Sequence, residues 1–311
     1  MIPDSCLHIR GLSDDRIRSF LSLAVSIKRD PEKYSQTLKG KTVLQFFVEN
    51  STRTRMSFEA ATRKLGGTSV VFAAATSSLQ KGESLLDTIQ TLCQYGIDGI
   101  VMRHSSGGSP EFVAGAVSVP VINAGDGQHE HPTQALLDAF TLLEHWKLEG
   151  APKNSLNGKT VAIVGDILHS RVARSNVHLL ARLGARVILC APQTLLPSDL
   201  SLFPAVEIEH RLDSAIPQAD AIMALRIQFE RQDDSLIPSK REYRHFWGLT
   251  PERMAIMKND AVVLHPGPMN RGLEIDPEVA DSSRSLILKQ VENGVWVRAA
   301  ILAMLVGGVK P

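Results

Sequence analysis

The sequence has no excess of charge, no cysteine framework and no long apolar run, and each shortage excludes a class of protein. Its 311 residues include 34 Lys or Arg and 33 Asp or Glu, a formal net charge of +1. Neither nucleic-acid binding nor attraction to a membrane surface is therefore indicated. The apolar stretch at 299–309 is too short to span a bilayer. No basic segment followed by an apolar one opens the chain, so we expect no signal peptide.

The three cysteines, Cys6, Cys93 and Cys190, lie far apart and lack the spacing of metal ligands. This usage is typical of reduced thiols in a cytoplasmic protein. A hydrophobic content of 43% is enough for sizeable cores. The length predicts two domains rather than one.

Apolar segments alternate with helical patterns along the chain, which predicts an α/β fold. We expect two domains, each a parallel sheet flanked by helices. The segment 150–158 is rich in glycine, proline and polar residues and is the best linker candidate. Predicted strands cover 42–48, 69–73, 99–102, 119–123, 160–164, 185–190, 219–225 and 262–265. Predicted helices cover 14–29, the segment from Ser51 to Gly66, 84–95, 132–149, 171–183 and 292–306.

The turn after the first predicted strand is the most informative part of the chain. There an apolar run meets four polar residues, Ser51, Thr52, Arg53 and Thr54, and a helix pattern follows. The first turn of a helix offers unpaired N–H groups and the positive end of the helix dipole. The planar fork of an arginine binds two phosphate oxygens. The pattern predicts a site for a phosphate or a carboxylate.

A plainer interpretation of these hydroxyls is an ordinary helix cap. A serine or threonine before a helix is usually an N-cap, and Arg55 and Arg63 can simply be solvated. Two hydroxyl–arginine pairs at one strand-to-helix turn favour the anion site.

Three motifs, in order along the chain, resemble one family. The segment 51–55 (STRTR) resembles the carbamoyl-phosphate signature of the aspartate and ornithine carbamoyltransferases. Matches also occur at 123–127 (NAGDG) with 131–134 (HPTQ), and at Arg103. The resemblance runs from about residue 40 to the C-terminus. It implies a carbamoyl-phosphate-binding domain at 1–149, joined by the C-terminal helix within 292–311, and an aspartate-binding domain at 150–291.

The resemblance implies specific roles in the first domain. The phosphate would be held by Ser51, Thr52, Arg53 and Thr54. The carbonyl oxygen would be surrounded by Arg103, His131 and Thr54, and Gln134 would hydrogen-bond the carbamoyl NH2 group. A lone histidine is normally a core residue, and the place of His131 in HPTQ is what favours the functional role.

The segment 77–84 (SSLQKGES) resembles the mobile loop that reaches the active site of a neighbouring subunit. The resemblance implies a homotrimer with shared active sites, in which Ser78 and Lys81 donate to the phosphate and to the second substrate. From the segment alone, a solvated surface loop would be the better interpretation. Enteric relatives carry a pair of lysines here, so only Lys81 is assigned.

The second domain is expected to select the amine. Arg171, at a helix start, and Arg226 and Gln228, after a strand, match the family's aspartate-binding positions. Two cationic sites suit the two carboxylates of aspartate. The HCLP and SMG motifs of ornithine enzymes are both missing from this sequence.

The segment 265–268 reads HPGP, and its glycine is a mild departure from the leucine or alanine of relatives. The resemblance implies that Gly267 and Pro268 contribute to the carbamoyl-phosphate site through a cis peptide bond, a form that only X–Pro bonds reach cheaply. The segment is also interpreted as a rigid turn, whether or not it contacts the substrates.

The resemblance implies transfer of the carbamoyl group of carbamoyl phosphate to the amine of L-aspartate, in pyrimidine biosynthesis. Positioning and electrostatics can carry such a reaction, so no cofactor, metal or protein base is expected. The domains are expected to close on the second substrate. Two alternatives stay open: a carbamoyltransferase for another amine such as ornithine, and a catalytically silent homologue that scaffolds dihydroorotase. Regulatory chains are further possible partners.

The remaining motifs carry less information. A predicted strand followed by Gly165 and Asp166 is compatible with a dinucleotide-binding site. No G-x-G-x-x-G pattern follows, however, so nucleotide binding is not favoured. We expect Arg271 to be structural and Arg298 to form an ion pair. The segment 241–247 is interpreted as the closing loop beside the aspartate-binding domain.

Overall fold

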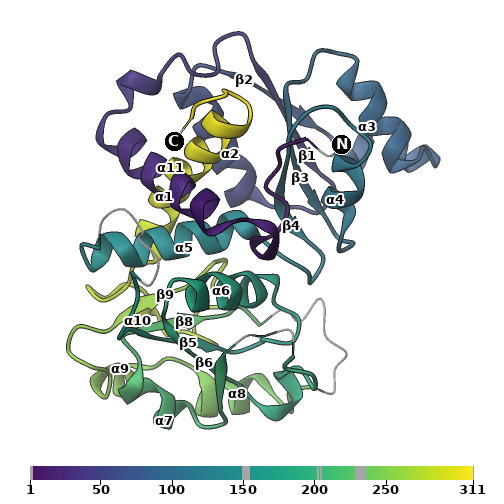
Figure 1. The fold of residues 1–311 in the computed structure, drawn as a ribbon. Helices are drawn as coiled ribbons and strands as arrows, with labels where there is room; N and C mark the ends of the chain where they lie inside the picture. The colour runs from purple at the N-terminus through teal and green to yellow at the C-terminus, as the bar shows by residue number, and fades with distance from the viewer. Residues whose placement is uncertain (1–2, 149–154, 202, 204, 228–235, 311) are drawn as a thin grey trace. The chain divides into compact units, whose positions relative to one another are not determined.

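The computed structural model describes residues 3–148, 155–201, 203, 205–227 and 236–310. Contacts divide the chain into two compact units. The first takes in Met1–Phe140, Glu149–Ala151 and Val291–Pro311, and the second takes in Thr141–Leu148 and Pro152–Gln290. Each unit contains a parallel sheet flanked by helices, so the predicted fold class is confirmed (Figure 1).

The first unit is built on a four-stranded sheet in the order β2-β1-β3-β4. Leu44 and Phe46 of β1 lie beside Ile100 and Met102 of β3, and all four side chains are buried in one core. The rings of Phe46 and Phe72 stack, with centroids 4.4 Å apart. The strands are Thr42–Phe47 (β1), Thr68–Phe72 (β2), Gly99–His104 (β3) and Val121–Asp126 (β4).

Helices of the first unit include the one that ends the chain. This helix, α11, packs back on the first unit as predicted, because Arg298 donates to Ser57 of α2 and Lys28 of α1 donates to Asn293. The helices with residues in this unit are α1 (Asp14–Arg29), α2 (Thr52–Lys64), α3 (Leu85–Cys93), α4 (Ser109–Ala114), α5 (Pro132–His145) and α11 (Ile287–Leu305).

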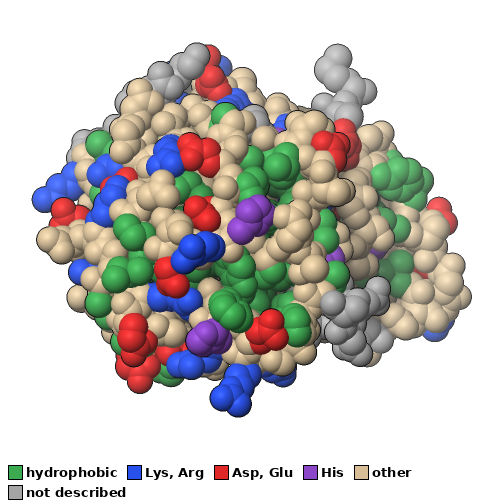
Figure 2. All heavy atoms as spheres, turned by 90° about the horizontal axis from the view of Figure 1, so that it is seen from below, with side chains coloured by type: hydrophobic (Ala, Val, Ile, Leu, Met, Phe, Trp, Pro, Cys, Tyr) green, Lys and Arg blue, Asp and Glu red, His purple; other side chains and the backbone are tan. Residues whose placement is uncertain are grey.

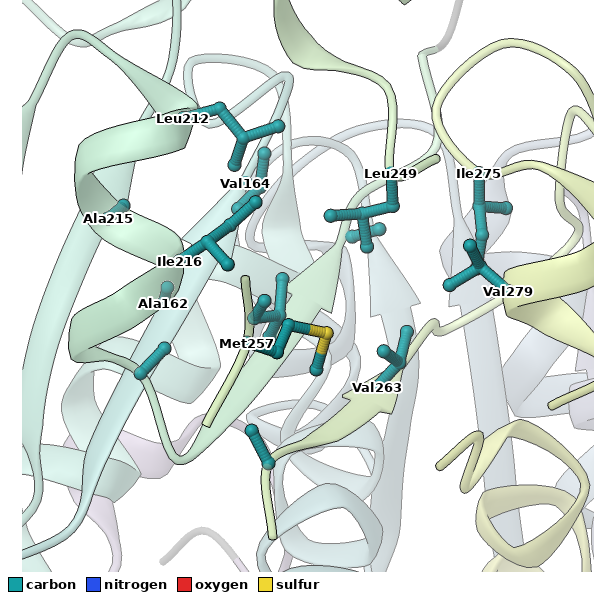
Figure 3. Packing of buried hydrophobic residues seen from close by; sticks show 14 of the residues in the cluster. Ala162, Val164, Leu212, Ala215, Ile216, Leu249, Met257, Val263, Ile275 and Val279 are labelled. Atoms are coloured by element: carbon teal, nitrogen blue, oxygen red, sulfur yellow. The ribbon is translucent and has the colours of Figure 1, made fainter. Parts of the chain in front are cut away.

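The second unit holds a five-stranded sheet in the order β7-β6-β5-β8-β9. Its core includes Val164, Ile216 and Val263. In Figure 3, Leu212 and Ile216 point toward Val164, and Met257 lies between Ile216 and Val263. The strands are Thr160–Val164 (β5), Arg186–Cys190 (β6), Val206–Glu209 (β7), Ala221–Ala224 (β8) and Val262–Leu264 (β9). The helices are α6 (Arg171–Arg182), α7 (Leu212–Ala215), α8 (Lys240–Trp247), α9 (Pro251–Ala255) and α10 (Pro277–Ala280).

One segment differs from its prediction. Residues 241–247 form most of α8 rather than a loop. Ser239 caps this helix by accepting from the N–H of Glu242, and the apolar side of the helix buries Tyr243. Of the predicted linker, residues 150–154 lie outside the described part of the chain.

The cysteines are free thiols, as predicted. Burial, with a smaller contribution from the Glu130 charge, raises the pKa of Cys6 to about 12. Burial also raises the pKa of Cys190 to about 12. Thiolates are the reactive form, so both thiols are inert near neutral pH.

Within the described ranges, no helix combines the length and the apolar character that crossing a bilayer requires. On the face shown in Figure 2, basic and acidic side chains are interspersed.

Two glycines with similar backbones provide a test of this packing. Gly66 has φ +78°, and a Cβ there would lie 2.4 Å from the Ser35 carbonyl oxygen; Gly40 has φ +76° and open space. We expect Gly40→Ala to cost about 1–2 kcal/mol of unfolding free energy from backbone strain alone. Gly66→Ala should cost about 1–3 kcal/mol more, because backbone must move. Urea denaturation midpoints measure both; equal losses would contradict the clash.

Candidate active site

The start of α2 lies at the carboxyl end of β1 and differs from the helix starts that other serines cap. Its N-cap, Ser51, has an extended backbone, but the Ser51 side chain makes no capping hydrogen bond. Side chains of Ser13, Ser84, Ser170 and Ser239 do cap their helices. The first turn of α2 also contains no acidic residue to offset the helix dipole. The ordinary-cap interpretation is therefore not supported, and Ser51 keeps its hydroxyl for another partner.

Two side chains of this turn face solvent and one is buried. Thr52 and Arg53 are exposed, whereas Thr54 is buried. Exposed donors on an uncapped helix start can reach an anion from solution without losing a packing role.

Arg103 is the last but one residue of β3, the strand beside β1. It pairs in register with Phe47 of β1. Its Nη2 donates to Glu49 Oε1 at 2.6 Å, and its Nη1 donates to the Ala124 carbonyl oxygen at 3.2 Å. The guanidinium is thus held between Glu49 in the loop after β1 and the backbone of β4.

His131 and Gln134 come from the segment that follows β4. His131 is buried and its carbonyl accepts the Gln134 N–H at the start of α5. Asp126 organises the turn between β4 and His131 through its hydrogen bonds. Burial alone would raise the pKa of Asp126, but hydrogen bonds from His129, Asn123 and the Gly108 and Glu130 N–H groups hold it below its usual value. The strands β1, β3 and β4 are adjacent and parallel, so their carboxyl ends lie at one edge of the sheet. The predicted residues at 51–54, 103, 131 and 134 all lie at or after these carboxyl ends.

Ser78 and Lys81 lie in a short 3₁₀ turn (Ser78–Lys81) that follows the edge strand β2. Both are exposed. The Ser78 hydroxyl hydrogen-bonds Glu83, and Glu83 also accepts from Thr88 at 3.0 Å. These contacts order the turn and leave the Lys81 ammonium at the surface.

In the second unit, Arg171 and Arg226 follow neighbouring strands. Arg171 begins α6, after β5, and is buried; Arg226 follows β8 and is half-buried. The chain leaves β5 toward β6 on one side and returns as β8 on the other. Carboxyl ends of strands at such a switch point are where open α/β sheets bind ligands. Gln228 lies outside the described residues.

The segment after β9 contains the predicted cis peptide bond between Gly267 and Pro268. The Gly267 N–H donates to His265 Nδ1 at 2.8 Å, so Nδ1 accepts and Nε2 carries the proton toward Glu274 at 3.1 Å. Asn270 Nδ2 donates to the Ile227 carbonyl oxygen at 3.1 Å. This turn therefore anchors the backbone next to Arg226.

Comparison with known proteins decides the family. The carbamoyl-P binding domain model of the aspartate/ornithine carbamoyltransferases matches residues 5–144, and the Asp/Orn binding domain model matches residues 157–305. The chain belongs to the aspartate/ornithine carbamoyltransferase family.

Individual carbamoyltransferases match over nearly their whole length. The chain is 51% identical to the aspartate carbamoyltransferase catalytic subunit of Myxococcus xanthus, over 95% of this chain and 97% of that protein. It is 53% identical to the Nocardioides sp. subunit, over 98% and 95%. Aspartate transcarbamoylase of Trypanosoma cruzi in complex with N-(phosphonacetyl)-L-aspartic acid matches with a TM-score of 0.87 at 32% identity, over 97% and 95%. Ornithine carbamoyltransferase of Thermus thermophilus matches at 0.85 and 28%, over 98% and 100%.

Two carboxylates of this carbamoyltransferase were not predicted. Glu49 holds Arg103, and Asp138 accepts from Gln134 Nε2 at 2.8 Å. Glu49 lies just before the STRTR motif at 51–55, and this place was its only signal in the sequence. Arg271 is structural as predicted, because both of its terminal nitrogens contact Asp281 at 2.7 Å.

Proposed function

We propose that this member of the family catalyses transfer of the carbamoyl group from carbamoyl phosphate to the amine of L-aspartate, giving N-carbamoyl-L-aspartate and phosphate, a step of pyrimidine biosynthesis. The observation that carries this is identity of 51–53%, over nearly whole chains, to proteins named aspartate carbamoyltransferase catalytic subunit. The solved ornithine enzyme is 28% identical. The absence of the HCLP and SMG motifs points the same way.

The first step is binding of the phosphate at the start of α2. Arg53 and the hydroxyls of Ser51, Thr52 and Thr54 are the proposed donors. Their support is the uncapped first turn, which contains no acidic residue and has exposed side chains at 52 and 53. Arg53 binds phosphate through two N–H groups, which fixes the orientation as well as the charge.

The second step is polarisation of the carbonyl. Arg103, His131 and Thr54 are proposed to donate to the carbonyl oxygen, on which negative charge develops as the amine attacks. Donors that are already in place stabilise this charge without reorganisation. Arg103 is held in place by Glu49 and the Ala124 carbonyl. Gln134 is proposed to accept from the carbamoyl NH2 group.

The bond changes need no protein nucleophile. The amine nitrogen of aspartate forms a bond to the carbonyl carbon, and the bond from that carbon to the phosphate oxygen breaks. The amine loses a proton, which the departing phosphate accepts. The proposed roles of the chain are to position, to orient and to stabilise charge.

The second unit is proposed to bind aspartate through Arg171, Arg226 and Gln228. Support comes from Arg171 and Arg226, which follow adjacent strands at the switch point of the sheet. The cis Gly267–Pro268 segment is proposed to aim the Pro266 and Gly267 carbonyls at the substrates. We therefore propose a carbamoyl-phosphate-binding domain at 1–149 with 292–311, and an aspartate-binding domain at 150–291.

A product assay tests the proposal directly. Purified protein with carbamoyl phosphate and either L-aspartate or L-ornithine should form carbamoyl-aspartate and no citrulline. Citrulline formation would favour an ornithine enzyme, and no product with either amine would favour a silent scaffold.

Substitution of Arg226 by alanine should separate the two substrates. The arginine is proposed to contact only the dicarboxylate, so the KM for aspartate should rise by about tenfold to a hundredfold while the KM for carbamoyl phosphate changes little. Steady-state kinetics at saturating co-substrate measures both constants. Arg271→Ala, which breaks only the surface pair with Asp281, is the control; equal effects of Arg226→Ala on both constants would count against its role.

We also propose that the chain forms a homotrimer in which Ser78 and Lys81 serve a neighbour's site. The support is the exposed turn that carries them and the edge strand beside it, where Val70 and Val71 are 42% and 43% exposed. A closed ring of identical head-to-tail contacts would cover such an edge.

A further inference from the structure

A buried arginine connects three helices of the first unit close to the proposed carbamoyl site. Arg298 of α11 lies against α2 and near Asp138 of α5. We propose that Arg298 and Asp138 form a positioning pair that sets which end of the Gln134 amide faces the substrate. The inference rests on the proposed function, because it deepens the role assigned to Gln134.

Arg298 is enclosed on several sides. It is 4% exposed, and its Nη1 donates to Ser57 Oγ at 2.8 Å. Its Cζ lies 5.2 Å from the centre of the Phe58 ring. A Cβ on Gly294 would come within 2.7 Å of Nη1, so the absence of a side chain at 294 makes room for the guanidinium.

The guanidinium stays charged in this setting. Burial lowers the pKa of Arg298 to about 10, and the charge of Asp138 opposes the shift. At neutral pH the group therefore remains protonated and supplies the cation that a buried carboxylate requires.

Asp138 lies fully buried on α5, one helical turn after Gln134. A nearby opposite charge favours the ionised form of a carboxyl group, and an ionised carboxylate can only accept hydrogen bonds. The Gln134 NH2 group must then face it, as the 2.8 Å contact from Nε2 to Oδ1 records. The carbonyl end of the amide, an acceptor, is left for the substrate. An acceptor is what the carbamoyl NH2 group needs.

A purely structural pair makes a different prediction. If Arg298 and Asp138 only hold α2, α5 and α11 together, their loss should weaken every ligand of the site alike. A positioning pair should affect ligands that carry an NH2 group and spare those that do not. Acetyl phosphate, which has a methyl group in place of the NH2, separates the two cases.

The experiment uses Asp138→Asn in the full-length protein. The variant has nearly the same shape but no obligatory acceptor, so the Gln134 amide is free to turn over. We expect the affinity ratio of carbamoyl phosphate to acetyl phosphate to fall by about three- to tenfold, the value of one hydrogen bond. Affinity for inorganic phosphate should stay unchanged. Titration calorimetry without aspartate measures all three ligands.

Companion variants keep the result interpretable. Gln134→Ala should lose the same preference, and retention of the preference there would overturn the proposal by removing Gln134 from the carbamoyl site. Loss in Gln134→Ala with no loss in Asp138→Asn would overturn the positioning pair while leaving the proposed function intact. Equal weakening of all three ligands in Asp138→Asn would also overturn it.

Two further variants cover folding and specificity. If Asp138→Asn does not fold, Ser57→Ala removes only one hydrogen bond to Arg298 and should shift the same ratio by a smaller factor; an unchanged ratio would overturn the proposal. Asp220→Asn removes a half-buried carboxylate of the second unit, which accepts from the Thr160 N–H and from Lys258. It should leave the carbamoyl-to-acetyl ratio as in the parent protein, and a matching fall there would show a nonspecific effect and overturn the assignment.

Discussion

Arg53→Ala should lower turnover by about 10²–10³-fold while the protein stays folded, because one preorganised donor to the reacting group contributes this much. The side chain is exposed at the start of α2, so its removal opens no cavity. Turnover at saturating substrates measures the effect, and a thermal melt confirms the fold.

Arg63→Ala is the matched control for this prediction. Arg63 lies on the same helix, is also exposed, and belongs to the last turn rather than the first. It should keep the parent turnover. Activity of Arg53→Ala within a few-fold of the parent would remove Arg53 from the site.

Mixing two inactive variants should restore activity if active sites are shared between chains. In a ring of three, a mixture of Lys81→Ala and Arg53→Ala chains creates one junction with an intact Arg53 surface and an intact Lys81 loop. Closure of the ring leaves the other two junctions damaged, so about one site in three should recover in each mixed ring. That is a rise of about 10²-fold over the parents' background.

Subunit exchange followed by native mass spectrometry identifies the mixed rings. Lys81→Ala mixed with parent-like Arg63→Ala serves as a control for exchange itself. Verified mixed trimers with no more activity than either variant would show that the loop does not act across subunits.

Much of the fold could be predicted from the sequence, and the misses have physical causes. The strand at 160–164 was predicted to the residue because its five side chains are all buried and apolar or hydroxylated. The edge strand β7 was missed because it is short. It has only four residues, so its alternation of valine and isoleucine with glutamates does not stand out. Helix α8 was missed because a charge-rich segment with aromatic residues was interpreted as the closing loop beside the aspartate-binding domain. Its serine cap and buried Tyr243 were the local signals for a helix.

The site residues could be assigned from motifs, but the contacts between residues far apart in sequence could not be predicted. The phosphate turn is one continuous segment. By contrast, Arg298 reaches Ser57 across 241 positions, and Arg103 reaches Glu49 across 54. No periodicity encodes such pairs, and only the arrangement of the strands and helices brings them together. The assignments at 51–54, 81, 131, 171 and 226 stay predictions until the variants are measured.

The missing cap on α2 means that this helix begins less stably than a helix with a serine cap, by about 1 kcal/mol. An anion at that turn would restore the lost interactions, so ligand binding and the persistence of the helix start are thermodynamically linked. Selection for a stronger cap, with an aspartate at 51 for example, would then raise stability and repel the anion together. The serine at position 51 therefore balances the stability of the helix start against affinity for the anion.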